Sequence, residues 1–266
     1  MKQILLTMCA VSGIAFAQIQ EVMGKGSIDW GTRTVQAVGI GAPNPNLPAV
    51  AARPAAIRAA RDIALRNALE IIQGIQLSSS TTVANYMLEN DRIQTQVSGF
   101  IRTFKESDPK YMSDKTIEIT VSVPLDGQMN EALLPQQIEK QPRAIPVATK
   151  SMGKSFSGLI IDARGLKVLP ALSPQIFNED GKEIYGTAFV ARDFAVKWGV
   201  VGYAKTPEQA QGMKDRIGEK PGIIKAKASK NGGVDLVVSN TDAADIASAA
   251  KSENFLADCR VIVLVD

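Results

Sequence analysis

The segment 148–155, ATKSMGKS, is the stretch that comes nearest to a nucleotide-binding motif. It fits a relaxed phosphate-loop pattern, with Ala148 in place of the first glycine. In a phosphate loop a helix follows directly, so that its backbone N–H groups face the phosphates. Here the next residues, FSGLIIDA, have the composition of a strand. We therefore interpret the segment as a basic linker rather than a nucleotide site.

The same segment contains Ser151 and Lys154 in an S-x-x-K arrangement, which acyl-enzymes use for a serine nucleophile and its lysine. That chemistry needs the serine at the start of a buried helix. Ser151 lies instead in the linker, and the partner motifs S-D-N and K-T-G do not occur in the sequence. The tetrad alone does not indicate an acyl-enzyme.

Two acidic groups could form a carboxylate site: Asp162 with Arg164 in IIDARG, and Glu179 with Asp180 in NEDG. Carboxylates act as general acids or bases and bind hard cations. However, Asp180 before a glycine is ordinary turn chemistry, and an aspartate near an arginine at a strand end forms an ordinary ion pair. We favour the structural interpretation, and a carboxylate-dependent hydrolase is the weakest of three functional hypotheses.

The composition argues against several other classes of protein. The sequence has no histidine, which removes the commonest metal ligand and the commonest general base. No run of basic residues is long enough to indicate a nucleic-acid surface. Cys259 opens an apolar run and is expected in the core. We therefore predict no catalytic, cofactor-binding or metal-binding residues, no cofactor and no enzymatic activity.

Residues 1–17 have the three parts of a cleavable signal peptide. Lys2 is followed by an apolar run over 4–16, and Ala15-Phe16-Ala17 has the small-x-small form of a cleavage site. The alternative is a buried N-terminal helix. Cys9 lacks the small preceding residue of a lipoprotein signal, so a lipid anchor is not expected. Cleavage before Gln18 leaves Cys259 as the single cysteine and excludes an internal disulfide.

Residues 53–74 form the most regular helical pattern in the sequence. Pro54 suits a first helical turn, and Gly74 suits a left-handed end. The apolar stripe is built mainly from alanine, at steps of three and four residues. Such a narrow stripe allows a helix to lie very close to a sheet.

Four strands are expected around this helix, at 32–40, 75–83, 100–106 and 115–123, with a short helix at 86–98. In the last strand Ile117, Ile119, Val121 and Val123 alternate with polar residues, as in an antiparallel sheet with one wet face. Another short helix is expected at 127–134. These elements predict an α+β domain over 18–135, followed by an exposed linker at 136–155.

A second domain is expected over 156–266. A buried strand is predicted at 157–163, a hairpin around the turn at 178–181, and a helix at 190–198. After these come a strand at 200–204, a helix at 206–218, strands at 223–229 and 234–239, a helix at 241–251 and a strand at 260–265. The order from 200 onward is βαββαβ, which is typical of ferredoxin-like α+β domains.

The N-terminal block, residues 32–125, contains a series of characteristic segments: Gly39-Ile40-Gly41, the helix AAIRAARDIALRNALEIIQGI, SSSTTV, VSGFI and the strand TIEITVSVPL. With these segments it resembles the LPP-twenty lipoprotein family. That family includes small outer-membrane lipoproteins, and the flagellar proteins FlgP and the N-terminal part of FlgT are similar to it. The resemblance implies an envelope location and a structural or assembly role, often in rings around a flagellar rod. This sequence departs from it by lacking a lipobox and by carrying a long second domain.

Together these patterns predict a non-enzymatic secreted protein of the cell envelope with a structural or assembly role. Flagellar association is one version of this hypothesis, and a periplasmic ligand-binding module for a glycan or peptide is the alternative. Expected partners are further copies of the chain or envelope and flagellar proteins, in the periplasm or at the outer membrane, with no nucleic acid. The strands at 115–123 and 260–265 are candidate edges for pairing between subunits, although the continuous apolar run of the second suggests a central position.

Overall fold

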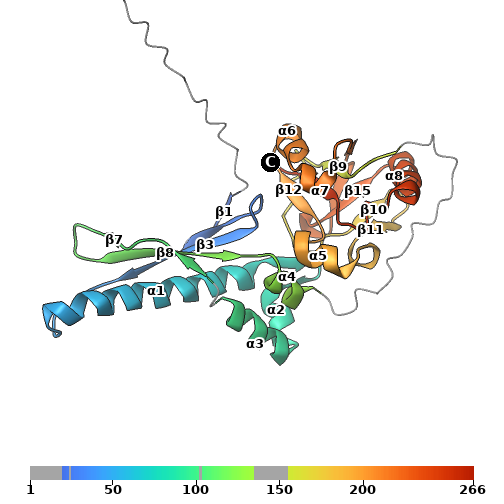
Figure 1. Ribbon diagram of the computed structural model, residues 1–266. Coiled ribbons are helices and arrows are strands. Elements are labelled where there is room, and N and C mark those ends of the chain that lie inside the picture. The colour runs from blue at the N-terminus through green and yellow to red at the C-terminus, as the bar shows by residue number, and fades with distance from the viewer. Residues whose placement is uncertain (1–19, 24, 102–103, 135–154) are drawn as a thin grey trace, which may run out of the picture.

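The helix α1 (Ala49–Gly74) is the longest element and lies along the strands β3 (Thr34–Gly41) and β8 (Ile117–Pro124) (Figure 1). As predicted, its buried stripe is mainly alanine, formed by Ala52, Ala56, Ala60, Ala64 and Ala68. The helix begins earlier than expected, because the N–H groups of Ala51 and Ala52 both bond to the carbonyl of Pro48. Pro54 therefore lies inside the helix. Gly74 is its last residue and is not left-handed, since the chain leaves through an extended Ile75.

This computed structural model describes residues 20–23, 25–101, 104–134 and 155–266. The predicted signal peptide, including Cys9, lies outside the described residues. So does the predicted linker apart from Ser155, together with the Ser151 and Lys154 tetrad.

The first sheet is antiparallel and has the strand order β1-β2-β3-β8-β6, with β7 also paired to β8. The remaining strands are β1 (Gln20–Met23), β2 (Gly26–Asp29), β6 (Lys105–Glu106) and β7 (Lys110–Tyr111). The alternation predicted in β8 is confirmed, because its four apolar side chains are all buried under α1. The expectation that 115–123 is an edge is wrong, because β8 pairs with β3 on one side and with β6 and β7 on the other.

Between α1 and β8 the chain breaks into shorter elements than expected. The single strand expected at 75–83 is a hairpin of β4 (Gln76–Ser78) and β5 (Thr81–Thr82). The helix expected at 86–98 is two helices, α2 (Val83–Leu88) and α3 (Asp91–Phe100), because the Asn90 side chain caps the second. The short helix α4 (Gln128–Leu133) forms as expected.

The C-terminal lobe, residues 155–266, contains a parallel sheet of four strands, in the order β12-β16-β9-β13. They are β12 (Gly202–Ala204), β16 (Val261–Leu264), β9 (Leu159–Asp162) and β13 (Gly222–Lys225). The helices around it are α5 (Arg192–Trp198), α6 (Pro207–Gly212) and α7 (Lys214–Ile217). The strand β16 is central and fully buried, so 260–265 is not an edge.

A second sheet in this lobe has the order β11-β10-β15-β14. It contains β10 (Ile176–Asn178), β11 (Glu183–Tyr185), β14 (Ala228–Lys230) and β15 (Asp235–Val238), followed in the chain by α8 (Asn240–Ser252). Short 3-10 turns lie at Thr187–Phe189 and Asn231–Gly233.

The predicted α+β class is confirmed. The strands and helices expected from 200 onward are present along the chain, although the helix expected at 206–218 is divided into α6 and α7. Their arrangement in space differs from a ferredoxin-like sheet. The segment expected as one strand at 223–229 divides into β13 and β14, which join different sheets. In addition, β9 lies between β16 and β13, and all pairings in that sheet are parallel. These pairings depend on contacts distant in sequence, which element order alone does not specify.

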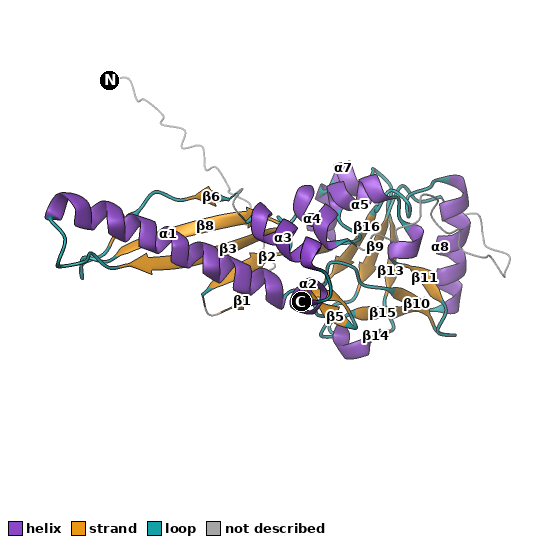
Figure 2. Ribbon diagram, turned by 90° about the horizontal axis from the view of Figure 1, so that it is seen from below, coloured by secondary structure: helices purple, strands orange, loops and turns teal. Residues whose placement is uncertain are grey.

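The molecule consists of a compact C-terminal lobe and an arm, formed by α1 and the β3–β8 ribbon, that extends away from it (Figure 2). One continuous cluster of buried apolar side chains crosses between the two parts. At the junction the rings of Trp30 and Tyr203 meet edge to face, with centroids 5.5 Å apart. None of the helices in the described residues is long and apolar enough to cross a membrane. The division into separable domains stays a prediction.

Candidate functional site

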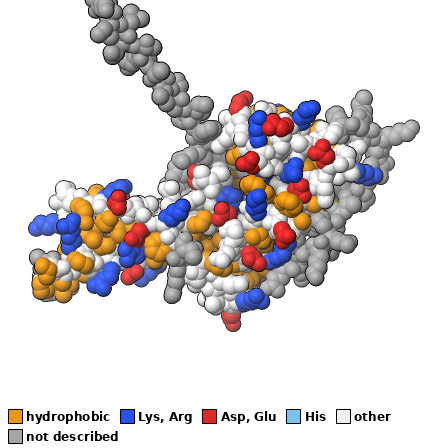
Figure 3. Space-filling model, in the orientation of Figure 1, with side chains coloured by type: hydrophobic (Ala, Val, Ile, Leu, Met, Phe, Trp, Pro, Cys, Tyr) orange, Lys and Arg blue, Asp and Glu red, His pale blue; other side chains and the backbone are white. Residues whose placement is uncertain are grey.

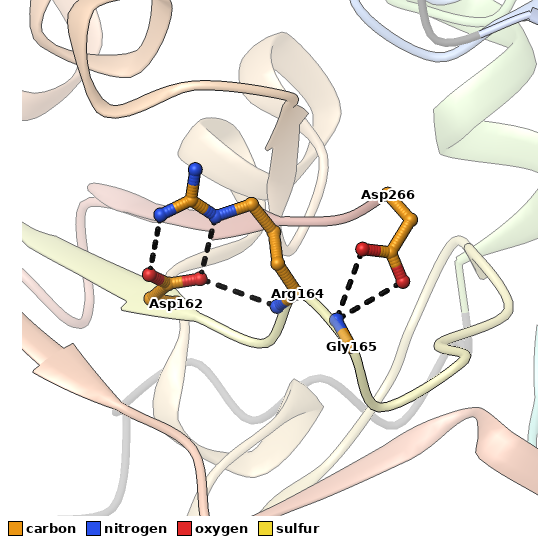
Figure 4. A network of polar contacts seen from close by, with 4 residues as sticks. All are labelled: Asp162, Arg164, Gly165 and Asp266. Atoms are coloured by element: carbon orange, nitrogen blue, oxygen red, sulfur yellow. Dashed lines mark hydrogen bonds and ion pairs between the residues drawn. The ribbon is translucent and has the colours of Figure 1, made fainter.

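The two predicted carboxylate groups have structural partners and lie apart. Asp162, at the end of β9, accepts hydrogen bonds from Nε and Nη2 of Arg164 at 2.8 and 2.6 Å (Figure 4). Beside it, the N–H of Gly165 donates to the carboxylate of Asp266 at 2.9 Å. The hydrogen bonds from Arg164 lower the pKa of the Asp162 carboxyl group. These hydrogen bonds therefore hold the end of β9 in place, and both carboxylates already have hydrogen-bond partners.

Glu179 and Asp180 lie in the β10–β11 turn, in the other sheet of the lobe. Glu179 accepts a hydrogen bond from the backbone N–H of Asn240 at 3.0 Å, and Asp180 accepts one from its side-chain amide at 3.1 Å. Asn240 is the first residue of α8, where negative charge is favourable. Both carboxylates thus bind the first residue of α8. The described residues contain no cluster of three or more potential metal ligands.

An unexpected polar centre lies where the arm joins the C-terminal lobe. Arg33, just before β3, donates from Nη1 to the carbonyls of Trp198 and Val201, both at 3.3 Å. Its Nη2 donates to the carbonyl of Leu125 at 3.2 Å and to Oδ1 of Asn130 at 2.8 Å. One guanidinium therefore joins the end of β8 and α4 to the segment between α5 and β12.

Arg216 of α7 approaches the same point from the other side. It donates from Nε to the carbonyl of Cys259 at 3.0 Å, from Nη1 to that of Trp198 at 2.6 Å, and from Nη2 to that of Gly199 at 3.0 Å. Both arginines thus donate to carbonyl groups at the C-terminal end of α5, which carries partial negative charge. Among the described residues, neither arginine forms an ion pair with a carboxylate.

Burial lowers the pKa of both arginines, and the proximity of Arg216 lowers the pKa of Arg33 further, to about 10. A pKa of about 10 keeps Arg33 charged at neutral pH. The space they occupy depends on Gly199, which has φ of 70° and whose Cβ, if present, would lie 2.0 Å from Nη1 of Arg33. A side chain at this position would be strained and would also displace the guanidinium.

A cavity of about 340 Å³ opens beside the two arginines. Its walls include Trp30, Trp198 and Tyr203, together with the carboxylates of Asp126 and Asp215. The Nε of Arg33 is buried and has no partner in the described part of the chain. The cavity offers aromatic surface and two carboxylates. Most other donors of the two arginines already bind backbone carbonyls, so the main effect of the centre is to join the lobe and the arm.

A larger groove of about 720 Å³ lies on another side of the junction. Hydroxyl and amide side chains dominate its lining: Ser78, Ser80, Thr81, Asn85, Ser173, Gln175 and Thr187, with Tyr86 and Glu89. Its two sides are tied by backbone hydrogen bonds from Leu172 to Gln76 at 3.0 Å and from Ser173 to Leu77 at 2.8 Å. Such a lining can bind an uncharged polar ligand through several hydrogen bonds.

Cys259 is buried, as expected. Burial raises the pKa of its thiol to about 12, so the group stays protonated and unreactive at neutral pH. Its backbone carbonyl, rather than its sulfur, takes part in the centre through Arg216. Sequence reasoning did not identify Arg33 or Arg216, because no local pattern distinguishes them from surface arginines.

The comparisons with known proteins concern the C-terminal lobe. The family model for the second domain of Treponema pallidum Tp0624 matches residues 158–266. The lobe is similar to that domain. The matched segment extends from β9 to β16 and includes Arg216 and Gly199, but it is less than half of the chain. A comparison with curated proteins gives no match. The resemblance of 32–125 to the LPP-twenty family lies outside the matched segment and stays a prediction.

Proposed function

We propose that the protein is a non-enzymatic component of the cell envelope with a structural or assembly role. The observation that carries this proposal is the fixed arm: α1 lies tightly on the β3–β8 ribbon, and Arg33 ties the base of the ribbon to the C-terminal lobe. A rigid arm can hold two binding surfaces at a set distance and angle, which suits a protein that assembles with others.

The sequence supports the location and the class of partner. The predicted signal peptide supports a location in the periplasm or at the outer membrane, and the resemblance to the LPP-twenty family favours an assembly role. Expected partners are further copies of this chain or other envelope proteins. The likeness to FlgP and FlgT makes a flagellar structure the first machine to examine.

The open edge of the parallel sheet is a suitable surface for self-assembly. In the described residues β13 pairs only with β9, and Ile223 is exposed. The N–H groups of Gly222 and Ala226 bond toward β9, so by alternation that of Ile223 points outward. An outward N–H on an edge strand can pair with a strand of another subunit.

Sedimentation velocity of the mature chain, residues 18–266, tests this proposal. We expect concentration-dependent oligomers for the native sequence and for Ile223→Thr, which keeps the backbone donor. Ile223→Pro removes that donor and should yield a folded monomer, because proline is tolerated on an edge strand. A native chain that stays monomeric at all concentrations and turns over a small substrate would contradict the proposal.

The polar groove favours the second candidate function, a periplasmic module that binds a glycan. Titration with N-acetylglucosamine tetramer, followed by NMR, tests this directly. Binding should shift resonances of the groove and be lost in Asn85→Ala, which changes a lining residue. Asn46→Ala, in the exposed loop before α1, is the matched control and should bind normally. Shifts that do not involve the groove would rule out this function for it.

A further inference from the structure

The free end of the arm exposes more large apolar side chains than any other part of the described surface. We define the arm tip as residues 40–58 and 110–118. Among the described residues, nine large apolar side chains are exposed, and five of them lie in the arm tip: Ile40, Leu47, Val50, Tyr111 and Met112. Figure 3 shows hydrophobic atoms gathered at the end of the arm. The other four lie in separate segments of the chain.

These side chains surround the end of the arm and do not form one flat face. Tyr111 pairs with Ile117, whose side chain faces α1, and the guanidinium of Arg53 lies 4.2 Å from the Tyr111 ring centroid. Ile40 pairs with Glu118, on the opposite face of the sheet. Val50 is in the first turn of α1 and is 86% exposed. A partner with a flat surface would cover one side only, whereas a lipid interface can surround a tip that enters it.

The charges of the arm tip are complementary to an anionic surface. It carries four cations, Arg53, Arg58, Lys110 and Lys115, and two carboxylates. Glu118 is paired with Lys110 at 3.0 Å, and Asp114 accepts hydrogen bonds from the N–H and hydroxyl of Thr116. No acidic residue occurs from 30 to 61. The first turn of α1 therefore has no carboxylate to offset the positive end of its helix dipole.

We propose that the arm tip inserts into the interface of an anionic membrane. The five apolar side chains would enter the boundary between headgroups and acyl chains. Arg53, Arg58 and Lys115 would reach the lipid phosphates from behind them, as long basic side chains do at such interfaces. This inference rests on the proposed envelope function for its biological setting, and it names the surface to which the arm is directed.

Co-sedimentation of the mature chain with vesicles tests the inference. We expect binding to vesicles of phosphatidylglycerol and phosphatidylethanolamine, weakened when NaCl is raised from about 0.05 to about 0.5 M, and much weaker binding to phosphatidylcholine. Val50→Asp should weaken binding by about tenfold or more, because it places a charge where an apolar side chain enters the interface. Leu88→Asp is the matched control, since Leu88 is 82% exposed on α2; its binding should stay within about twofold.

Three results with vesicles would overturn the inference: no binding to anionic vesicles, equal binding to phosphatidylcholine, or equal loss in the two variants. If Val50→Asp dissociates oligomers in the absence of lipid, the arm tip is a protein interface and the inference is wrong. The proposed assembly role is tested separately by Ile223→Pro. Loss of oligomers in that variant, with vesicle binding lost only in Val50→Asp, would support both.

Discussion

At the scale of single residues, Arg33 is the side chain on which the arrangement of arm and lobe most depends. It donates to four acceptors in three segments of the chain. Arg33→Met removes all four hydrogen bonds, although the carbonyl of Trp198 keeps the one from Arg216. The variant should lower the free energy of unfolding by roughly 2–4 kcal/mol. Chemical denaturation of the mature chain measures this. Arg58→Met removes an exposed arginine from α1 and should change the free energy by less than about 0.5 kcal/mol; equal effects would contradict the role of Arg33.

The ion pair between Asp162 and Arg164 predicts a dependence of stability on pH. Because the folded pKa of Asp162 is lowered, its contribution is present above its unfolded pKa, about 4, and is lost as pH falls through the folded value. Asp162→Asn should cost about 0.5–1 kcal/mol at pH 7, a modest value because solvent screens this pair.

The difference between Asp162→Asn and the native chain should shrink below about pH 4, where the native carboxyl group protonates. Denaturation midpoints across this range measure it. Asp108→Asn, at an exposed aspartate, is the control and should show little difference at any pH. A cost of Asp162→Asn that is the same at pH 7 and pH 2.5 would contradict the ion-pair account.

At the scale of elements, the arm depends on how closely α1 approaches the ribbon. A Cβ on Gly39 would lie 2.1 Å from the carbonyl oxygen of Ala60 and 2.4 Å from the nitrogen of Ala64. Because both are backbone atoms of α1, the whole helix would have to move. Gly39→Ala should therefore destabilise the protein by roughly 1–3 kcal/mol.

The matched control is Gly99→Ala in α3, where nothing lies within 4 Å of the added methyl group. It should stabilise the protein by about 0.5–1 kcal/mol, because alanine loses less conformational freedom in a helix than glycine does. Thermal or chemical denaturation of the two variants should thus give shifts of opposite sign. Stabilisation by Gly39→Ala, or equal destabilisation by the two variants, would contradict the close-contact account.

The elements that sequence patterns predicted well are those with long periodicity, such as α1 and β8. Their apolar stripes report burial directly, even though the start of α1 at Ala49 was missed because Pro54 resembles a first-turn proline. The hairpin β4–β5 and the break at Asn90 were missed because a few polar residues decide them. The parallel pairing of β9 with β16 and β13 could not be read from local patterns, since it joins segments far apart in sequence.

The candidate site was harder to predict than the fold. The carboxylates at Asp162 and Glu179 were noticed because acidic residues near turns are conspicuous, and the structural interpretation of each agrees with the hydrogen bonds they accept. Arg33 and Arg216 were missed because their partners are backbone carbonyls, which carry no signal in sequence. The one sequence signal was Gly199, next to the end of α5, because a glycine leaves room for another side chain, here that of Arg33.

At the scale of the whole molecule, the predicted linker at 136–155 should be cut first by a protease. Limited proteolysis of the mature chain should leave two resistant fragments, near 18–135 and 156–266. Because the two parts share a buried cluster and the contacts of Arg33, the fragments should stay associated in size-exclusion chromatography without denaturant. Early cleavage within α1 or β15, or fragments that separate at once, would contradict this description.

The central claim is that the protein acts in the cell envelope through assembly rather than catalysis. The most direct test is chemical cross-linking in intact cells of the native host, followed by fractionation and N-terminal sequencing. We expect a chain that starts at Gln18, is recovered with the envelope, and is cross-linked into species larger than a monomer. An uncross-linked monomer that retains Met1 and is recovered from the cytoplasm would contradict the claim.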